Sequence, residues 1–184
     1  MTQYKLCKIF NENKSQTIKK LNEIYGDANL WFISDNIIGI SYDYRSKDYK
    51  HILKSILEFK MNQIIINSTI FLQILKYCID NNYFISQMSF LDSISVEDKE
   101  FVDYQVNLLN REEDQLIKEK QRNILVNELH WLTSDGCIDI RLIEFTIKTK
   151  NELYSNVTIY SNGVVLIDDK RLTYELNNLI SFII

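Results

Sequence analysis

The first 67 residues alternate between strand-like and helix-like apolar patterns, and this order constrains the fold more than any other feature of the chain. Residues 4–10 alternate well enough between polar and apolar side chains to predict a strand. Gly26 then predicts the end of a helix. The apolar face of that helix consists of Ile18, Leu21, Ile24 and Tyr25. The chain is therefore expected to open with a strand and an amphipathic helix.

Two further apolar runs, residues 30–34 and 37–44, are separated only by Asp35 and Asn36. A short polar pair that tolerates positive φ between β-rich runs predicts a hairpin. Residues 63–67 have the pattern of a short buried strand. Between hairpin and strand lies the clearest helical stripe of this region, formed by Tyr49, Ile52, Leu53, Ile56 and Leu57. The resulting order, β-α-β-β-α-β, predicts a ferredoxin-like unit.

A long, polar-centred helix is predicted between residues 95 and 132, and Ser95 begins it with a pattern that resembles a capping box. Residues 110–123 are almost wholly polar, so the segment is either one helix with a solvent-exposed middle or two helices. Because Asp114 and Lys118 can form an i, i+4 pair that stabilises a helix by about 0.2–0.5 kcal/mol, we expect one continuous helix. The apolar stripe of its second half consists of Ile124, Leu125, Leu129 and Leu132.

The flanking segments predict more strands and two more helices. Residues 70–79 are apolar nearly all round a helix, and residues 83–91 are strand-like. An Asn-Gly pair at 162–163 predicts a hairpin turn, and the expected C-terminal strands are residues 137–148, 154–160 and 164–167. Asp168 and Asp169 then cap a final helix, whose apolar face consists of Leu172, Leu176, Leu179 and Ile183.

Together these patterns predict an α+β protein in three parts. Residues 1–92 form the ferredoxin-like βαββαβ-type unit, and residues 95–132 form the long linking helix or a helical pair. Residues 136–184 form an antiparallel, three-stranded β-meander with its helix, packed on the rest. A length of 184 residues and an apolar content of 46% suffice for one good core with a small satellite, and not for two full domains.

Charge and cysteine content restrict the cellular setting. The net charge of −4 excludes a general electrostatic attraction to nucleic acid or to anionic lipid, although a local basic patch is compatible with it. Three cysteines without a C-x-x-C pair indicate reduced thiols and no zinc site. The start of the chain lacks the apolar stretch of a signal peptide, and residues 64–79 are too short and too often interrupted to span a bilayer. We expect a cytoplasmic protein without membrane association.

No recognisable catalytic or metal-binding motif is present, and the four glycines form neither of the two common phosphate-binding loops, so we expect no cofactor. Asp-Asp-Lys at residues 168–170 matches half of a nuclease metal motif, but the neighbouring strand offers no second carboxylate. Structural roles are expected for the two histidines and for two of the thiols, namely His51, His130, Cys78 and Cys137. The chain is therefore not expected to be an enzyme, although a site assembled from distant residues stays open.

An aromatic and basic segment is the candidate nucleic-acid surface, and it consists of Tyr42, Tyr44, Arg45, Lys47, Tyr49 and Lys50, followed by His51. Aromatic rings can stack on bases while positive charges hold phosphates. The alternative is a strand end whose tyrosines pack inward, and Asp43 and Asp48 dilute the positive charge.

The candidate protein-binding surface is an acidic cluster of Glu112, Glu113 and Asp114 in the polar middle of the long helix. Such a cluster can steer a basic partner toward the protein. The eleven tyrosines favour the same function, because Tyr and Trp are preferred interface anchors. The apolar ending, residues 179–184, fits either a core helix or a homodimer seam.

We therefore expect a non-catalytic protein of the inhibitor or immunity-factor type that acts by occluding a protein partner. The alternative is an RNA- or DNA-binding module that uses the aromatic and basic segment. The absence of proline and the abundance of Ile, Asn, Lys and Tyr suggest an AT-rich genome. A small acidic protein from such a genome would suit a phage or mobile element that counteracts a host defence system.

Overall fold

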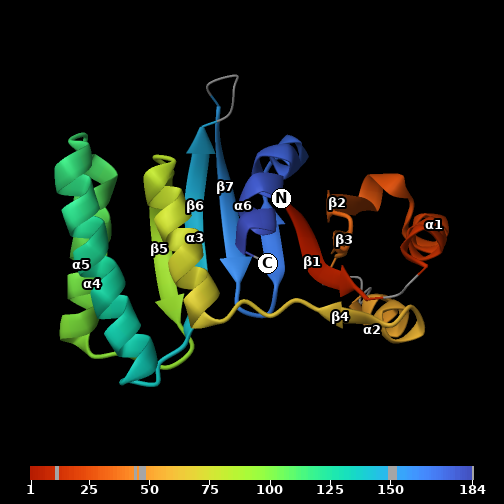
Figure 1. Cartoon of the computed structure of the whole chain (residues 1–184), viewed down its shortest axis with the longest axis horizontal. Coiled ribbons are helices and arrows are strands. Elements are labelled where there is room, and N and C mark those ends of the chain that lie inside the picture. Colours follow the sequence, from red (N-terminus) through yellow and green to blue (C-terminus); the bar gives the residue numbers. More distant parts are fainter. Residues whose placement is uncertain (11–12, 44, 46–48, 149–152, 184) are drawn as a thin grey trace. The chain divides into compact units, whose positions relative to one another are not determined.

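The computed structural model describes the whole chain except residues 11, 12, 44, 46–48, 149–152 and 184. Within the described residues the protein is α+β, with six α-helices and eight strands in a mostly antiparallel arrangement (Figure 1). It divides into two compact units. Unit 1 comprises residues 1–65 and 162–182, and unit 2 comprises residues 66–161 with residue 183. Unit 1 thus combines segments from the two ends of the chain.

The sheet of unit 1 has the strand order β2-β3-β1-β8, and β4 also pairs with β1. Its strands are β1 (Thr2–Ile9), β2 (Leu30–Ser34), β3 (Ile37–Ser41), β4 (Met61–Gln63) and β8 (Val164–Ile167). The predicted β2–β3 hairpin is confirmed. Residues 2–5 of β1 pair with β8, whereas residues 7–9 pair with β4. Two strands therefore share one edge of β1.

The strand predicted at residues 63–67 is wrong, because β4 already ends at Gln63. Ile64 and Ile66 are buried and Ile65 is exposed, so the alternation that suggested a strand belongs to a loop. The fully buried Lys5 lies where β1 changes neighbour, and its ammonium donates hydrogen bonds to the carbonyls of Ile64 and Asn162. Burial lowers the pKa of Lys5.

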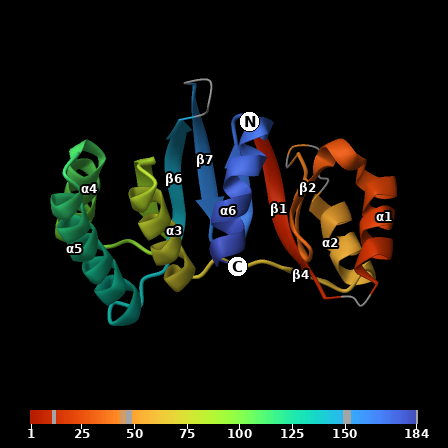
Figure 2. The same cartoon turned by 45° about the horizontal axis from the view of Figure 1, so that its top comes forward.

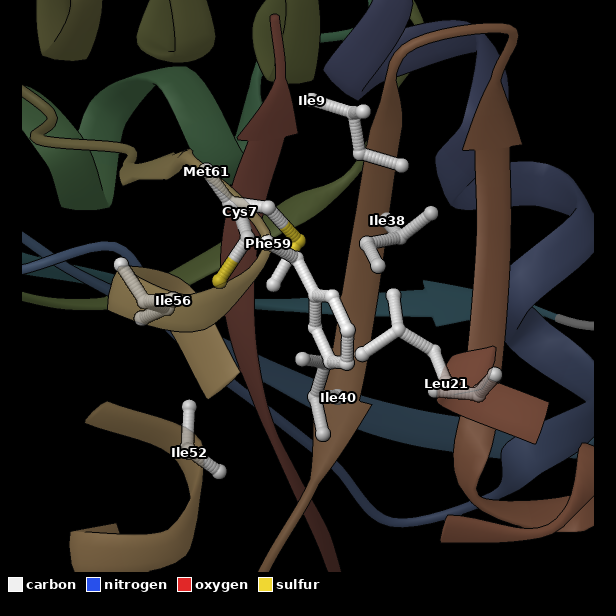
Figure 3. Packing of buried hydrophobic residues seen from close by; sticks show 10 residues of the cluster. Cys7, Ile9, Leu21, Ile38, Ile40, Ile52, Ile56, Phe59 and Met61 are labelled. Carbon is white, nitrogen blue, oxygen red and sulfur yellow. The ribbon is translucent and has the colours of Figure 1, made fainter. Parts of the chain in front are cut away.

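Two helices, α1 (Lys14–Tyr25) and α2 (Tyr49–Glu58), cover one face of the unit 1 sheet (Figure 2). Figure 3 shows the core that they enclose, which includes Cys7, Ile9, Leu21, Ile38, Ile40, Ile52, Ile56, Phe59 and Met61. The predicted end of α1 at Gly26 is confirmed, with a φ of 78° that favours glycine. The predicted apolar faces are too wide, because Ile24 is 53% and Leu57 81% exposed.

The opposite face of the unit 1 sheet packs against α6 (Thr173–Ile183), which follows the short 3-10 turn η2 (Lys170–Leu172). Strand alternation explains the two faces: Tyr4 and Trp31 point to the α6 side, while Cys7 points to the α1 and α2 side. The predicted apolar face of the final helical segment is confirmed as buried, namely Leu172, Leu176, Leu179 and Ile183.

Unit 2 has a three-stranded antiparallel sheet in the order β7-β6-β5. Its strands are β5 (Phe84–Phe90), β6 (Ile140–Lys148) and β7 (Tyr154–Tyr160), and helix α3 (Ser68–Asp80) contacts β5 and β6. The predicted strands and the predicted apolar helix are therefore present. Ile140 is buried at the start of β6, and from residue 143 on the buried residues alternate with partly exposed ones, namely Ile143, Phe145 and Ile147.

The predicted continuous helix is wrong. The segment forms two packed helices, α4 (Val96–Arg111) and α5 (Gln115–Ser134), separated by residues 112–114. The Asp114 carboxylate accepts hydrogen bonds from the backbone N–H groups of Leu116 and Ile117, at 2.9 and 3.1 Å. Such an N-cap stabilises a helix by about 1 kcal/mol, which is more than the contribution of the i, i+4 pair of Asp114 and Lys118 that favours a continuous helix. Lys118 instead donates to Asn82 at 2.6 Å.

The start of α4 agrees with the predicted cap, since the Ser95 hydroxyl accepts a hydrogen bond from the Asp98 N–H at 3.0 Å. None of the six α-helices in the described part of the chain is long and apolar enough to cross a membrane.

Candidate functional site

Two tyrosines of the aromatic and basic segment are committed to the core of unit 1. Tyr42 and Tyr49 are half-buried, pack against the core, and their ring centroids lie 5.3 Å apart. Gln3 donates a hydrogen bond to the Tyr42 hydroxyl at 2.6 Å, and the Tyr49 hydroxyl donates to Gln63 at 3.0 Å. Burial raises the pKa of both phenols. These rings therefore serve packing, and little of them is left to stack on a base.

The positive charges of the same segment face solvent. Arg45, Lys50 and His51 are exposed, and Tyr44 and Lys47 lie outside the described residues. The described charges of the segment are thus exposed while its two described rings are half-buried, whereas stacking binders of nucleic acid combine exposed rings with positive charge.

The acidic cluster forms the turn between α4 and α5, and two of its three carboxylates shape that turn. Asp114 caps α5, and the half-buried Glu112 accepts a hydrogen bond from the Asp114 N–H at 2.9 Å. Glu113 is exposed. Because this turn joins α4 to α5, the acidic cluster lies at the tip of the α4–α5 hairpin and not in the middle of a helix.

The α4–α5 hairpin, taken together with the C-cap residue Asp135, carries a slightly larger negative charge than the whole chain. Residues 96–135 contain ten Asp and Glu against five Lys and Arg, a formal net charge of −5, compared with −4 for the complete protein. The remainder of the chain therefore carries a net charge of +1. The excess of negative charge is therefore concentrated in residues 96–135. This segment has an electrostatic field that attracts positive charge.

A row of exposed apolar side chains runs along α5. Ile117, Ile124 and Trp131 are spaced seven residues apart and are 45%, 48% and 52% exposed. Side chains seven residues apart share one side of a helix, with a drift of about 20° per step. The buried face of the same helix consists of Leu125, Val126, Leu129 and Leu132. This α5 row therefore lies outside the core of unit 2.

The expectation that Ile124 belongs to the buried stripe is wrong. The seven-residue spacing of the α5 row is visible in the sequence and could have predicted it. The exposure of Ile124 is hard to predict because Ile124 directly precedes Leu125, and a helical pattern alone does not say which of two adjacent apolar residues faces the core.

A cleft of about 360 Å³ lies in unit 1 beside strand β2 and the start of α6. Its lining includes three aromatic residues and three polar ones, namely Tyr4, Trp31, Tyr174, Asp27, Lys170 and Asn177. The Trp31 Nε1–H donates to the Asn177 Oδ1 at 2.7 Å, which orients the amide of Asn177. The volume lies at the lower end of the range found for small-molecule sites, and the cleft is open to solvent. We call this the β2 cleft.

A glycine sets the floor beneath the β2 cleft. A Cβ atom on Gly39 would stand 3.0 Å from Cε3 of Trp31 and 3.3 Å from Cβ of Tyr4. The missing side chain lets the Trp31 and Tyr4 rings meet edge to face, with centroids 5.4 Å apart. Trp31 is thereby held against the sheet while its indole nitrogen reaches α6.

Within the Asp-Asp-Lys segment, Asp169 caps the 3-10 turn η2 that precedes α6. The Asp169 carboxylate accepts a hydrogen bond from the backbone N–H of Arg171 at 2.9 Å. It also forms a 2.6 Å ion pair with the guanidinium of Arg171. The Arg171 hydrogen bonds and charge lower the pKa of Asp169. Lys170 donates to the carbonyl of Ala28 at 3.3 Å. No group of three or more metal-binding side chains occurs within the described ranges.

Neither a histidine nor a cysteine lines the β2 cleft. The exposed His130 lies 3.2 Å from the hydroxyl of Ser134 at the end of α5, and the Cys137 thiol points to the Ser134 carbonyl at 3.8 Å. Cys78 is fully buried, and burial raises its pKa well above the ordinary range. A thiol held in this way is a poor nucleophile.

No family model, no curated protein and no solved structure matches this chain. Two surfaces of the described chain are candidate binding sites. These are the acidic α4–α5 hairpin with its α5 row, in unit 2, and the β2 cleft, in unit 1.

Proposed function

We propose that this protein is a non-catalytic binding protein of the inhibitor or immunity-factor type, which uses its α4–α5 hairpin to occlude a protein partner. The α5 row carries this proposal. Ile117, Ile124 and Trp131 expose large apolar surfaces on a helix whose core-facing side is already filled. Exposed apolar residues scattered singly need no explanation, whereas an aligned set that includes a tryptophan is typical of an interaction surface.

The dimensions of the α5 row favour a protein partner. A helix rises 1.5 Å per residue, so the distance from Ile117 to Trp131 along the axis is about 21 Å. Apolar side chains at a helical repeat fit a groove or a second helix on a folded protein. Nucleic acid offers no comparable apolar groove, and the net charge of −5 on residues 96–135 would repel its phosphates.

The negative charge of α4 and of the turn at residues 112–114 favours a basic surface on the partner, whereas α5 itself carries three Lys and Arg against two Glu. Opposite charge around an apolar contact raises the association rate and disfavours acidic competitors. Glu113 is exposed at the tip of the hairpin, where it can contribute to that field without a role in the turn. The proposed partner is therefore a protein with an apolar groove for the α5 row and a basic surface opposite α4 and the turn, and occlusion of that groove is the proposed mode of inhibition.

We further propose that residues 1–63 are a ferredoxin-like unit that has been modified at one edge. The strand order β2-β3-β1-β4 with antiparallel pairing supports this, as does the chain order β1-α1-β2-β3-α2-β4. The modification is that β8 pairs with residues 2–5 of β1, on the same edge of β1 with which β4 pairs. A C-terminal strand thus completes the sheet where β4 is too short to do so.

Affinity capture with matched variants tests the proposed function. The protein and its variants are immobilised, exposed to nuclease-treated lysate of the organism that encodes the chain, and the captured proteins are quantified by mass spectrometry. The double variant Ile124→Ser/Trp131→Ser removes two exposed anchors. The control is Leu57→Ser, which removes an apolar side chain that is 81% exposed on α2. Loss of two anchors is expected to weaken capture by about thirtyfold or more.

A second variant separates charge from shape. The triple change Glu112→Gln/Glu113→Gln/Asp114→Asn removes three charges but keeps the hydrogen-bond acceptors that form the turn, because Asn is as good an N-cap as Asp. Capture is expected to slow and to depend less on salt. The proposal is refuted if the captured proteins are identical for the α5-row variant, the Leu57 control and the unchanged protein, or if nuclease treatment abolishes capture.

A further inference from the structure

The free edge of β2 and the adjoining cleft form a second surface, in unit 1, that the hairpin does not involve. We propose that an extended peptide segment adds to the edge of β2 as a further strand, and that one of its bulky apolar side chains enters the β2 cleft. This inference is independent of the function proposed for the hairpin.

The first observation is that β2 lies at the edge of its sheet. In the described part of the chain β2 pairs with β3 on one side and with no strand on the other. Alternate N–H and C=O groups of an edge strand point away from its neighbour and are available to another chain. A bulge between Phe32 and Ser34 limits the regular part of this edge to residues 30–32. The expected ladder is therefore short.

The second observation is that the space beside this edge is open. All three residues of the regular edge, Leu30, Trp31 and Phe32, line the cleft of about 360 Å³. The side of the cleft away from the strand is formed by the start of α6, with Tyr174 and Asn177 among its residues. A groove between an edge strand and a helix is the geometry in which peptides are bound by strand addition.

The third observation is that another sheet edge in this protein is protected. In unit 2 the Asn110 side chain of α4 donates to the Ile85 carbonyl at 2.7 Å and accepts from the Ile85 N–H at 3.0 Å. One side-chain amide thus satisfies both backbone groups of a β5 residue, as a neighbouring strand would do. Residues 30–34 contain neither the lysine nor the proline that commonly blunts an edge strand. The bulge and the Ser181 hydrogen bond to the Ile33 carbonyl protect β2 only beyond its three regular residues.

The chemistry of the β2 cleft identifies the occupant. An extended polypeptide presents donors and acceptors at the spacing of the strand edge, which a compact small molecule does not. Aromatic walls from Tyr4, Trp31 and Tyr174 accept an apolar side chain. The oxygen of the Asn177 amide accepts the hydrogen bond from Trp31, so the NH₂ group of the same amide can donate to a peptide carbonyl. Lys170, which lines the same cleft, adds a positive charge that favours peptide oxygen atoms.

A peptide library selection tests the inference on the full chain. The protein carries Ile124→Ser and Trp131→Ser, so that peptides bound by the hairpin are not selected and Trp31 is the only remaining tryptophan. A phage-displayed library of random 12-residue peptides is the probe. Enriched peptides are expected to carry one bulky apolar residue within an extended, β-prone sequence, and to shift the emission of Trp31 when added as synthetic peptides.

Two measurements then distinguish strand addition from other binding. N-methylation of the peptide at successive positions should weaken binding at no more than two positions, which lie two residues apart, because alternate N–H groups face β2 and its regular edge is three residues long. Tyr174→Ala, at a side chain that is 73% exposed, should weaken binding tenfold or more. The matched control Phe182→Ala alters another exposed aromatic residue of α6 that does not line the cleft, and it should leave the affinity unchanged.

Four results would overturn the inference: no enriched peptide, no period of two in the N-methyl scan, equal effects of the two α6 variants, or self-association of the chain through β2. Each of them is independent of whether the hairpin captures a protein. Failure of the hairpin experiment alone leaves the peptide result intact, and the reverse also holds.

Discussion

Replacement of Asn110 should destabilise unit 2, because this side chain completes the edge of β5. Its amide makes two hydrogen bonds to the backbone of Ile85, at 2.7 and 3.0 Å. A hydrogen bond contributes about 0.5–1.5 kcal/mol net, and an unsatisfied backbone group that water cannot reach costs about 1–3 kcal/mol. Since β5 is an edge strand, water can replace part of the loss. We expect Asn110→Ala to lower the free energy of unfolding by about 2 kcal/mol.

The assay is urea denaturation followed by circular dichroism, together with hydrogen exchange of the Ile85 amide. With a denaturant slope of about 2 kcal/mol per molar, the midpoint should fall by about 1 M. The Ile85 amide should exchange faster than its neighbours in β5, because its partner has been removed. The control is Asn107→Ala, at an exposed position of the same helix.

Asn110→Asp sharpens the test, because it keeps the shape of the side chain. Its carboxylate can still accept from the Ile85 N–H, but it cannot donate to the Ile85 carbonyl and places negative charge against it. This variant should be at least as unstable as Asn110→Ala at pH 7. If Asn110→Ala lies within 0.5 kcal/mol of Asn107→Ala, an amount typical of neutral surface changes, Asn110 does not protect the edge.

Three further outcomes are expected. Gly163→Ala should cost about 3 kcal/mol, measured as a fall in Tm, because φ is +72° and the new Cβ would stand 2.0 Å from the Ile64 carbonyl oxygen; a change below 1 kcal/mol would contradict this. Burial raises the pKa of Cys7 from its ordinary 9.0 to about 12, so above pH 9 only the unfolded chain ionises this thiol. Stability should therefore fall with rising pH between 9 and 12, and Cys7→Val should reduce that slope by about 1.4 kcal/mol per pH unit, whereas Cys137→Val should leave it unchanged. Asp114→Ala should destabilise α5 by about 1 kcal/mol in thermal unfolding, while Asp114→Asn should be nearly neutral; equal effects would exclude the cap as the cause.

Elements whose signals lie within a few neighbouring residues could be predicted from the sequence. The β2–β3 hairpin depends on Asp35 and Asn36 between two apolar runs, and the end of α1 depends on Gly26, which adopts positive φ. The α+β class and the order of the elements follow from such local patterns. The acidic and aromatic character of candidate surfaces is also visible in the sequence, because it requires only composition.

The errors arose where a contact between distant residues decided the outcome. The break between α4 and α5 was missed because Lys118 pairs with Asn82 instead of with Asp114, which is left to cap α5. The strand β4 was misplaced because Ile64 contacts β1 through a single backbone bond to Leu6 outside the ladder. A one-dimensional pattern carries no information on which partner a polar side chain will find.

The sequence by itself determined the class of fold, the position of most helices and strands, and the lack of any common phosphate loop or cysteine pair. Only the tertiary structure decided that the two ends of the chain build one unit, that the amide of Asn110 covers one sheet edge, and that the edge of β2 faces a cleft. The physical reason is that local propensity acts over a few residues, whereas burial and the pairing of backbone edges depend on which segments meet in space.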